Sequence, residues 1–451
     1  MNVDLIVLVF HIAHHTLVLC TAISDFYSLS HHATYIASLF VSPKISQLSG
    51  NRFDIVLRNV CIAGSCTDET PQEDRLRRIT CTLRSAATRL KETGFINYFG
   101  MQRFGKFHDT HLVGVAVLKG DFEKACDIIM RTKENENEQS ISTRNKWSNR
   151  FHGIDMEDEG AVREAEMKCA KVVSRELGRF MNCETSIVST LARNPRDYKR
   201  AFGSISKHMR SMFLHAYQSY IWNKAASHRI GNGSILDSAD GSDKEVRVGD
   251  LVLVEDRGLA DGGNGTSGLK GKAVKEVTQD DVEMCKYSIT DVVLPLAGSK
   301  IEYPSDSTGD VYEDLLAEDG LTKEYFEKVQ DRELAVGGDY RKVMCKPLDV
   351  DFEIKLYNDP TQPLVKTDLM EVTNASLECV DVTADENEGV EKSKDRTIVG
   401  MVIGFTLPPS AYATIALREL TRRPTSSQYQ TELLLEGDCE ANLESVSKAQ
   451  E

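Results

Sequence analysis

Apolar and polar residues alternate from Arg52 to Val60, and this period of two predicts a half-buried β-strand. Further along, apolar residues recur every three or four positions from Leu76 to Leu90, and Gly94 follows as a natural helix stop. This spacing predicts an amphipathic helix whose other face carries arginine. The same spacing predicts three more helices: 121–131, 161–180 and 206–230.

The later part of the chain is richer in short β-type runs. Strands are predicted over 251–254, 291–294, 351–356 and 398–407, and the last of them ends at Pro408-Pro409. A helix is predicted from 410 to 422, with Ser410 as its N-cap. Because strands and helices are interleaved along the chain, the pattern predicts a mixed α/β fold of two or three domains.

Four segments lack this periodicity. Residues 1–44 are apolar and rich in histidine, and the abrupt change of composition that follows leaves them outside the predicted core. Residues 258–268 contain five glycines, which predicts a flexible surface turn. Residues 378–391 hold six carboxylates and no basic residue, and residues 438–451 form an acidic tail. Both acidic segments are typical of solvated chain.

The composition of the 451 residues is that of an acidic globular protein, with 54 Lys and Arg against 69 Asp and Glu. The hydrophobic share of 41% argues against wholesale disorder and against a multi-span membrane protein. The membrane-like stretch 5–23 is interrupted by three histidines, so no membrane partner is expected. Eleven cysteines without a Cys-x-x-Cys pair predict reduced thiols in the nucleus or cytosol, and no metal site.

Positive charge is concentrated in two windows of this acidic chain. Residues 75–111 contain eight basic and two acidic residues, and residues 193–210 contain six basic and one acidic residue. Such strips suit the phosphates of a nucleic acid, although two solvated helix faces would have the same composition.

The segment from Gly94 to Gly105 combines four aromatic residues, amides and an arginine directly after the first basic helix. This composition suits stacking on unpaired bases and binding of their phosphates, and a packed turn is the alternative. The candidate RNA-binding residues are Asn97, Tyr98, Phe99, Gln102, Arg103, Phe104 and Arg210. A second aromatic segment, 213–223, is expected to be mostly core, with His215 as an interior imidazole.

Several stretches, taken in order, resemble the TruD family of pseudouridine synthases, and more closely its eukaryotic branch. The resemblance covers about residues 45–436. It rests on the following stretches: Leu48-Ser49-Gly50-Asn51-Arg52-Phe53, Asn97 to Gly105, Thr110-His111 with Gly114, His215 to Asn223, Gly249 to Val254, Asp291 to Leu296 with Gly298, Tyr303-Pro304, Tyr340-Arg341-Lys342, and Leu407 to Thr414 with Arg418-Glu419.

The resemblance implies an enzyme that isomerises uridine to pseudouridine in tRNA or another RNA, without a cofactor, after the base leaves its stack. It further implies a nuclear or cytoplasmic monomer whose Asn51 orients a nucleophilic aspartate and whose Phe53 lies against the target ring. The implied fold is a pseudouridine synthase core of antiparallel sheet, 45–94 plus 346–437, with a large inserted TRUD domain, 95–345. The Asn97–Gly105 stretch would line the cleft where the two meet.

The nucleophile itself is not assigned. The family carries its aspartate in a Gly-Thr-Lys-Asp-Arg type motif upstream of Asn51, whereas only Asp4 and Asp25 precede Asn51 here, and neither has a neighbouring Lys or Arg. One interpretation is a shortened or alternatively started version of the enzyme. The others are a catalytically dead paralogue that still binds RNA, and a scaffolding protein that uses the two basic strips.

Overall fold

The computed structural model describes residues 3–4, 8–11, 50–62, 72–105, 107–133, 136–178, 181–231, 246–255, 272–328, 334–359, 362–366, 370, 372, 380–381 and 398–423. The chain divides into two compact units. The first comprises Met1–Asn97, Asn264–Gly268 and Met344–Glu451, and the second comprises Tyr98–Gly263 and Leu269–Val343. The predicted turn at 258–268 and the acidic tail lie outside the described residues.

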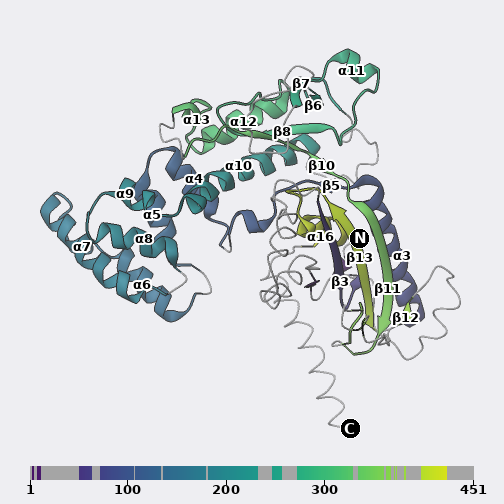
Figure 1. The fold of residues 1–451 in the computed structure, drawn as a ribbon, viewed down its shortest axis with the longest axis horizontal. Coiled ribbons are helices and arrows are strands. Elements are labelled where there is room, and N and C mark those ends of the chain that lie inside the picture. The colour runs from purple at the N-terminus through teal and green to yellow at the C-terminus, as the bar shows by residue number, and fades with distance from the viewer. Residues whose placement is uncertain are drawn as a thin grey trace, which may run out of the picture. The chain divides into compact units, whose positions relative to one another are not determined.

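The first unit is built on a five-stranded antiparallel sheet in the order β12-β11-β13-β3-β2 (Figure 1). Its elements are β1 (Val3–Asp4), β2 (Leu8–His11), β3 (Asn51–Leu57), β4 (Cys61–Ile62), α3 (Gln72–Thr93), β5 (Phe95–Ile96), β10 (Met344–Cys345), β11 (Leu348–Tyr357), β12 (Val380–Asp381), β13 (Ile398–Leu407) and α16 (Ala413–Thr421).

One face of this sheet is apolar and buried. The strand period of two places Ile55 and Leu57 of β3 beside Ile403 and Met401 of β13, and all four are at most 1% exposed. Helix α3 lies along the sheet beside β11 and contributes a buried stripe from Leu76 to Leu90 (Figure 1). The residues on the predicted apolar faces of the strands and the helix thus form the core.

The second unit combines helices with a four-stranded antiparallel sheet in the order β7-β6-β8-β9. Its elements are a 3-10 turn η3 (Met101–Arg103), α4 (Thr110–Leu118), α5 (Phe122–Met130), α6 (Glu138–Ser148), α7 (Glu159–Glu176), α8 (Asn182–Leu191), α9 (Tyr198–Gly203), α10 (Lys207–Ile230), β6 (Leu251–Glu255), β7 (Lys272–Glu276), α11 (Gln279–Glu283), β8 (Val292–Leu296), α12 (Ser307–Glu318), α13 (Glu324–Lys328) and β9 (Asp339–Lys342).

The long helix α10 forms the centre of the second unit. Helix α4 crosses it at Gly114, where a Cβ atom would lie 2.4 Å from the backbone oxygen of Phe213. At its far end Arg229 is fully buried and pairs with Asp250, Nη2 to Oδ2 at 2.6 Å. Close backbone approach and a buried ion pair therefore hold α10 in place.

Four expectations from the sequence need correction. Ser410 is not the cap of the last helix: it has a φ of +69°, and α16 begins after Tyr412. The helix predicted over 161–180 ends at Glu176. The pattern leaves residues 1–44 outside the predicted core, whereas β2 pairs with β3 and β1 pairs with β4, so two of their segments belong to sheets. Likewise β12 lies within the acidic stretch 378–391.

Candidate functional site

The first candidate region is the start of β3. Asn51 lies opposite Leu407, and Phe53 lies opposite Phe405. A Cβ atom on Gly50 would lie 2.5 Å from the backbone oxygen of Leu407, so the close approach of these two backbone segments requires glycine there. Asn51 is exposed, while the half-buried ring of Phe53 lies 6.0 Å from that of Phe405. The packing thus positions one ring that is still partly accessible.

The opposite face of the same strand carries an ion-pair cluster. Arg52 contacts Asp54 at 2.9 Å and Asp351 at 2.5 Å, and Gly404 leaves the space that its guanidinium occupies. Partial burial works against the charge of Arg52, but hydrogen bonds with Asp351 and Asp54 outweigh it and raise the pKa of the guanidinium. Because side chains alternate along a strand, Asp54 points away from the face of Phe53.

Asp4 also lies apart from this region. The register of β1 places Asp4 opposite Cys61, which follows β3 at the end remote from Asn51. Asp25 is outside the described residues. Neither Asp4 nor Asp54 is therefore placed to join Asn51 and Phe53 as a nucleophile.

The Asn97–Gly105 stretch is largely a packed turn. Asn97 and Phe99 are buried, and the backbone N–H of Phe99 donates to Asn223 Oδ1 at 2.8 Å. The side-chain N–H of Asn223 returns a hydrogen bond to the oxygen of Phe99 at 3.1 Å, and the hydroxyls of Tyr98 and Ser227 lie 2.9 Å apart. Two of the predicted RNA-binding residues are therefore covered, and Gln102 is exposed.

Two arginines lie against the ring of Phe99. The guanidinium carbon of Arg341 lies 4.1 Å from the ring centroid, and that of the half-buried Arg103 lies 5.4 Å from it. The Nε atom of Arg103 is buried and has no hydrogen-bond partner among the described residues. The sequence did not single out Arg341 as a site residue, since only the fold brings β9 beside η3 and α10.

A ladder of four side chains adjoins this turn: Lys224, Tyr220, His111 and Phe104. The ammonium of Lys224 lies 5.6 Å from the Tyr220 centroid, and the rings of Tyr220 and His111 stack at 4.5 Å with an interplanar angle of 16°. Phe104 meets His111 edge-on at 6.0 Å. Burial lowers the pKa of His111, against the opposing carboxylates of Asp319 and Asp109. Three half-buried rings beside an exposed cation suit contact with an unpaired base.

Two arginines of the second basic window, residues 193–210, make contacts within the protein. Arg196 pairs with Glu123 at 2.7 Å, and the Nε–H of Arg210 donates to the oxygen of Ile205 at 2.9 Å. His215 is exposed, which corrects its expected place in the interior, and its Nδ1 lies 2.8 Å from Gln218 Oε1. Trp222, by contrast, is core as expected.

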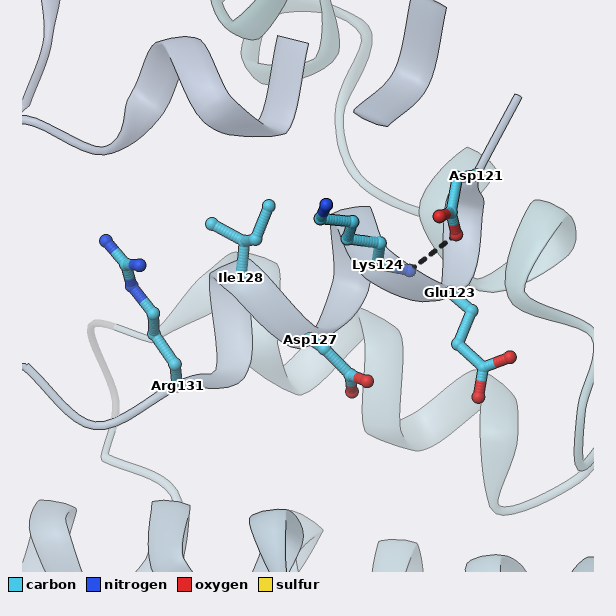
Figure 2. A pocket seen from close by; sticks show the side chains of 6 residues that line it. All are labelled: Asp121, Glu123, Lys124, Asp127, Ile128 and Arg131. Carbon is cyan, nitrogen blue, oxygen red and sulfur yellow. Dashed lines mark hydrogen bonds between the residues drawn. The ribbon is translucent and has the colours of Figure 1, made fainter. Parts of the chain in front are cut away.

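A depression of about 470 Å³ lies along α5 in the second unit, and Figure 2 shows the six side chains around it: Asp121, Glu123, Lys124, Asp127, Ile128 and Arg131. Its carboxylates already serve the fold, since Asp121 caps α5, Asp127 pairs with Arg150 and Glu123 pairs with Arg196. It contains none of the residues singled out from the sequence.

The described residues contain no other recognisable kind of site. No three His, Cys, Asp or Glu side chains gather there as metal ligands. The seven described cysteines are all free. Nor does any described helix combine the length and the apolar character needed to cross a membrane.

Comparison with known proteins identifies the family. The family model of tRNA pseudouridine synthase D (TruD) matches residues 41–420, and the chain therefore belongs to the TruD family. It is 34% identical over 406 residues to multisubstrate pseudouridine synthase 7 of Schizosaccharomyces pombe, covering 87% of this chain and 51% of that protein. It is 32% identical over 393 residues to the human pseudouridylate synthase 7 homolog, covering 86% of this chain and 48% of that protein.

The chain thus spans about half the length of these curated relatives. Its fold is similar to the crystal structure of a protein assigned as TruD of Methanosarcina mazei, with a TM-score of 0.55 at 23% identity, over 84% of this chain and 70% of that one. The predicted mixed α/β fold with antiparallel sheets is confirmed.

Proposed function

We propose that this chain isomerises uridine to pseudouridine within RNA, with tRNA among its substrates. The observation that carries the proposal is the family match over residues 41–420, which includes both strands that meet at Asn51 and Leu407. In this assignment Phe53 lies against the target base and Asn51 positions the reacting carboxylate. The ladder of Lys224, Tyr220, His111 and Phe104 contacts unpaired bases close to the target uridine in the RNA.

The test is product formation. Purified full-length chain is incubated with uridine-containing tRNA transcripts, and pseudouridine is mapped by its carbodiimide adduct. Phe53→Ala should lower turnover by roughly 100-fold while RNA affinity stays within about twofold, because a mispositioned base loses reactivity before it loses binding. Phe352→Ala is the matched control, since Phe352 is another half-buried ring in the same sheet.

An RNA-binding protein without turnover is the second candidate. It is favoured by one observation: β1, which contains Asp4, pairs with β4 and not with β3, and Asp54 points away from the face of Phe53. It predicts salt-sensitive RNA binding by folded protein and no product at any uridine. A negative product assay with intact binding would reject the isomerase proposal in favour of this one.

A further inference from the structure

Helix α3 presents a cationic face to solvent that the proposed reaction does not use. One side of the helix is buried against the sheet, and the other exposes Arg75, Arg77, Arg78 and Lys91. Arg77, the half-buried Arg84 and Lys91 are seven residues apart, so they form a line with a spacing of about 10 Å. This face is the α3 basic strip.

The four exposed cations of this strip are not consumed by the fold. Arg75, Arg77, Arg78 and Lys91 make no ion pair or hydrogen bond with any described residue, although Glu73 and Asp74 open the same helix. The surface of α7 is different: there Lys168 pairs with Glu164 at 2.6 Å, and the sequence alternates in charge. The α3 basic strip therefore keeps its charge available for a partner.

The helix itself does not need these arginines. Arg75 lies in the first turn, near the positive end of the helix dipole, where cations are unfavourable, and Arg77 and Arg78 lie in the second turn, where the dipole effect has fallen off. The helix dipole thus favours none of the three, and their clustering in a chain of net charge −15 points to a role outside folding.

The chemistry of the strip favours a phosphate backbone as occupant. Arginine binds phosphate oxygens in a bidentate manner. The exposed side chains between the cations are the small Cys81, Ser85 and Thr88, and the hydroxyls of the last two can meet ribose hydroxyls. No aromatic or large apolar side chain is exposed on α3. The strip thus lacks the rings that unpaired bases stack on, and the apolar anchors that a protein partner requires.

We propose that the α3 basic strip docks the sugar-phosphate backbone of double-helical RNA, such as a stem that flanks the modified uridine. The proposal rests on the proposed function for its choice of RNA as substrate. It assigns the paired and unpaired parts of the substrate to different surfaces: α3 binds a stem without reading its sequence, and the ring-bearing ladder on α4 and α10 meets unpaired bases.

The test compares three full-chain variants. The first replaces Arg75, Arg77 and Arg78 by Gln, and a second replaces the same three by Lys. The control removes the same charge from α7, as Lys168→Gln with Lys171→Gln and Arg175→Gln. The probes are an RNA hairpin with a stem of about 12 base pairs, which matches the length of α3 of about 33 Å, and a single-stranded oligouridine.

The Gln variant should bind the hairpin about tenfold more weakly near 0.1 M salt, and the slope of log affinity against log salt should fall by about two to three. Its oligouridine affinity should change less than twofold. The Lys variant should retain most hairpin affinity, because the contact is with charge, and the α7 control should lose less than twofold. Circular dichroism verifies that each variant is folded.

The proposal is overturned if the Gln variant keeps the hairpin affinity and salt slope of the parent chain, or if oligouridine binding falls as much as hairpin binding. It is also overturned if that variant loses binding to poly-glutamate while keeping the hairpin, because the strip is then a protein site. Pseudouridine formation is read separately, so a chain that binds hairpins through α3 and forms no product rejects the proposed function alone.

Discussion

Helices α3 and α10 are both rich in basic residues, yet the fold uses them in opposite ways. Helix α3 carries six Lys and Arg against three carboxylates, whereas α10 carries four and has no carboxylate at all. Judged by sequence alone, α10 is the helix whose charged residues are all basic. In the structure twelve of its side chains are buried, and among them Arg229 is enclosed with Asp250, whereas Lys207 and Lys224 remain exposed.

The difference shows that basic residues in a sequence do not by themselves define a binding surface. On α3 the cations alternate with a single buried stripe, so they reach solvent. On α10 the partner of Arg229 comes from the loop before β6, 21 residues further along the chain, and converts an apparent phosphate ligand into a core ion pair. What decides the role of a guanidinium is whether a carboxylate is folded onto it.

The largest effect on stability is expected for Asp250→Ala, and it tests the contrast between the buried Arg229 and the exposed arginines of α3. It leaves Arg229 buried without its carboxylate and should lower the free energy of unfolding by about 3–5 kcal/mol. Urea unfolding followed by tryptophan fluorescence measures the loss, since Trp147 and Trp222 both belong to the second unit. Arg77→Ala on α3, followed by circular dichroism, should change stability by less than about 0.5 kcal/mol. Equal losses in both variants would contradict the contrast.

The packing of α10 against α4 gives a second, smaller effect. Gly114→Ala places a Cβ atom 2.4 Å from the backbone oxygen of Phe213, so the helices must separate, at a cost of about 1–3 kcal/mol. The matched control is Gly203→Ala in α9, where the added Cβ meets nothing within 4 Å. That control should be neutral or stabilising by up to about 1 kcal/mol. A stable Gly114→Ala protein would show that α4 and α10 tolerate a wider spacing.

The smallest predicted effect is a pH dependence of stability that arises from His111 in the ladder. Burial lowers the pKa of His111; the carboxylates of Asp319 and Asp109 oppose the shift, while His108 and Arg131 add to it. The stabilisation from the neutral imidazole is therefore present above its unfolded-state pKa of about 6.5 and is lost as pH falls through the lower folded-state pKa.

His111→Phe keeps a ring in the stack and removes this titration. The stability of the parent chain relative to the variant should thus decrease between about pH 7 and pH 5. Urea unfolding of both proteins at each pH measures the difference. A difference that does not vary with pH would mean that the pKa of His111 is the same in the folded and unfolded states, and would contradict the lowered pKa.

Local periodicity was a good guide wherever one face of an element is buried and the other is wet. The strand predicted over 398–407 is β13 with those bounds, and the amphipathic pattern from Leu76 to Leu90 with its stop at Gly94 is α3. Gly94 has a φ of +73°, the left-handed conformation that a helix stop requires. The sequence did not reveal α4, whose residues are apolar on nearly every side and so show no period.

The candidate site was harder to predict from local sequence patterns. The pattern Gly50 to Phe53 predicted a strand start, and the structure adds that Arg52 and Phe53 face opposite sides of the sheet. The aromatic stretch after Gly94 was a reasonable candidate surface from its composition, but Asn223 and Ser227, more than a hundred residues away, fold onto it and cover part of it.

The sequence by itself determined the periods of strand and helix, the two basic windows and the family resemblance, because these depend on residues close together in the chain. Only the tertiary structure decided which cations remain in water and which rings remain accessible. The physical reason is that burial and ion pairing are set by partners distant in sequence: Asp250 neutralises Arg229, whereas no described residue neutralises Arg75, Arg77 or Arg78.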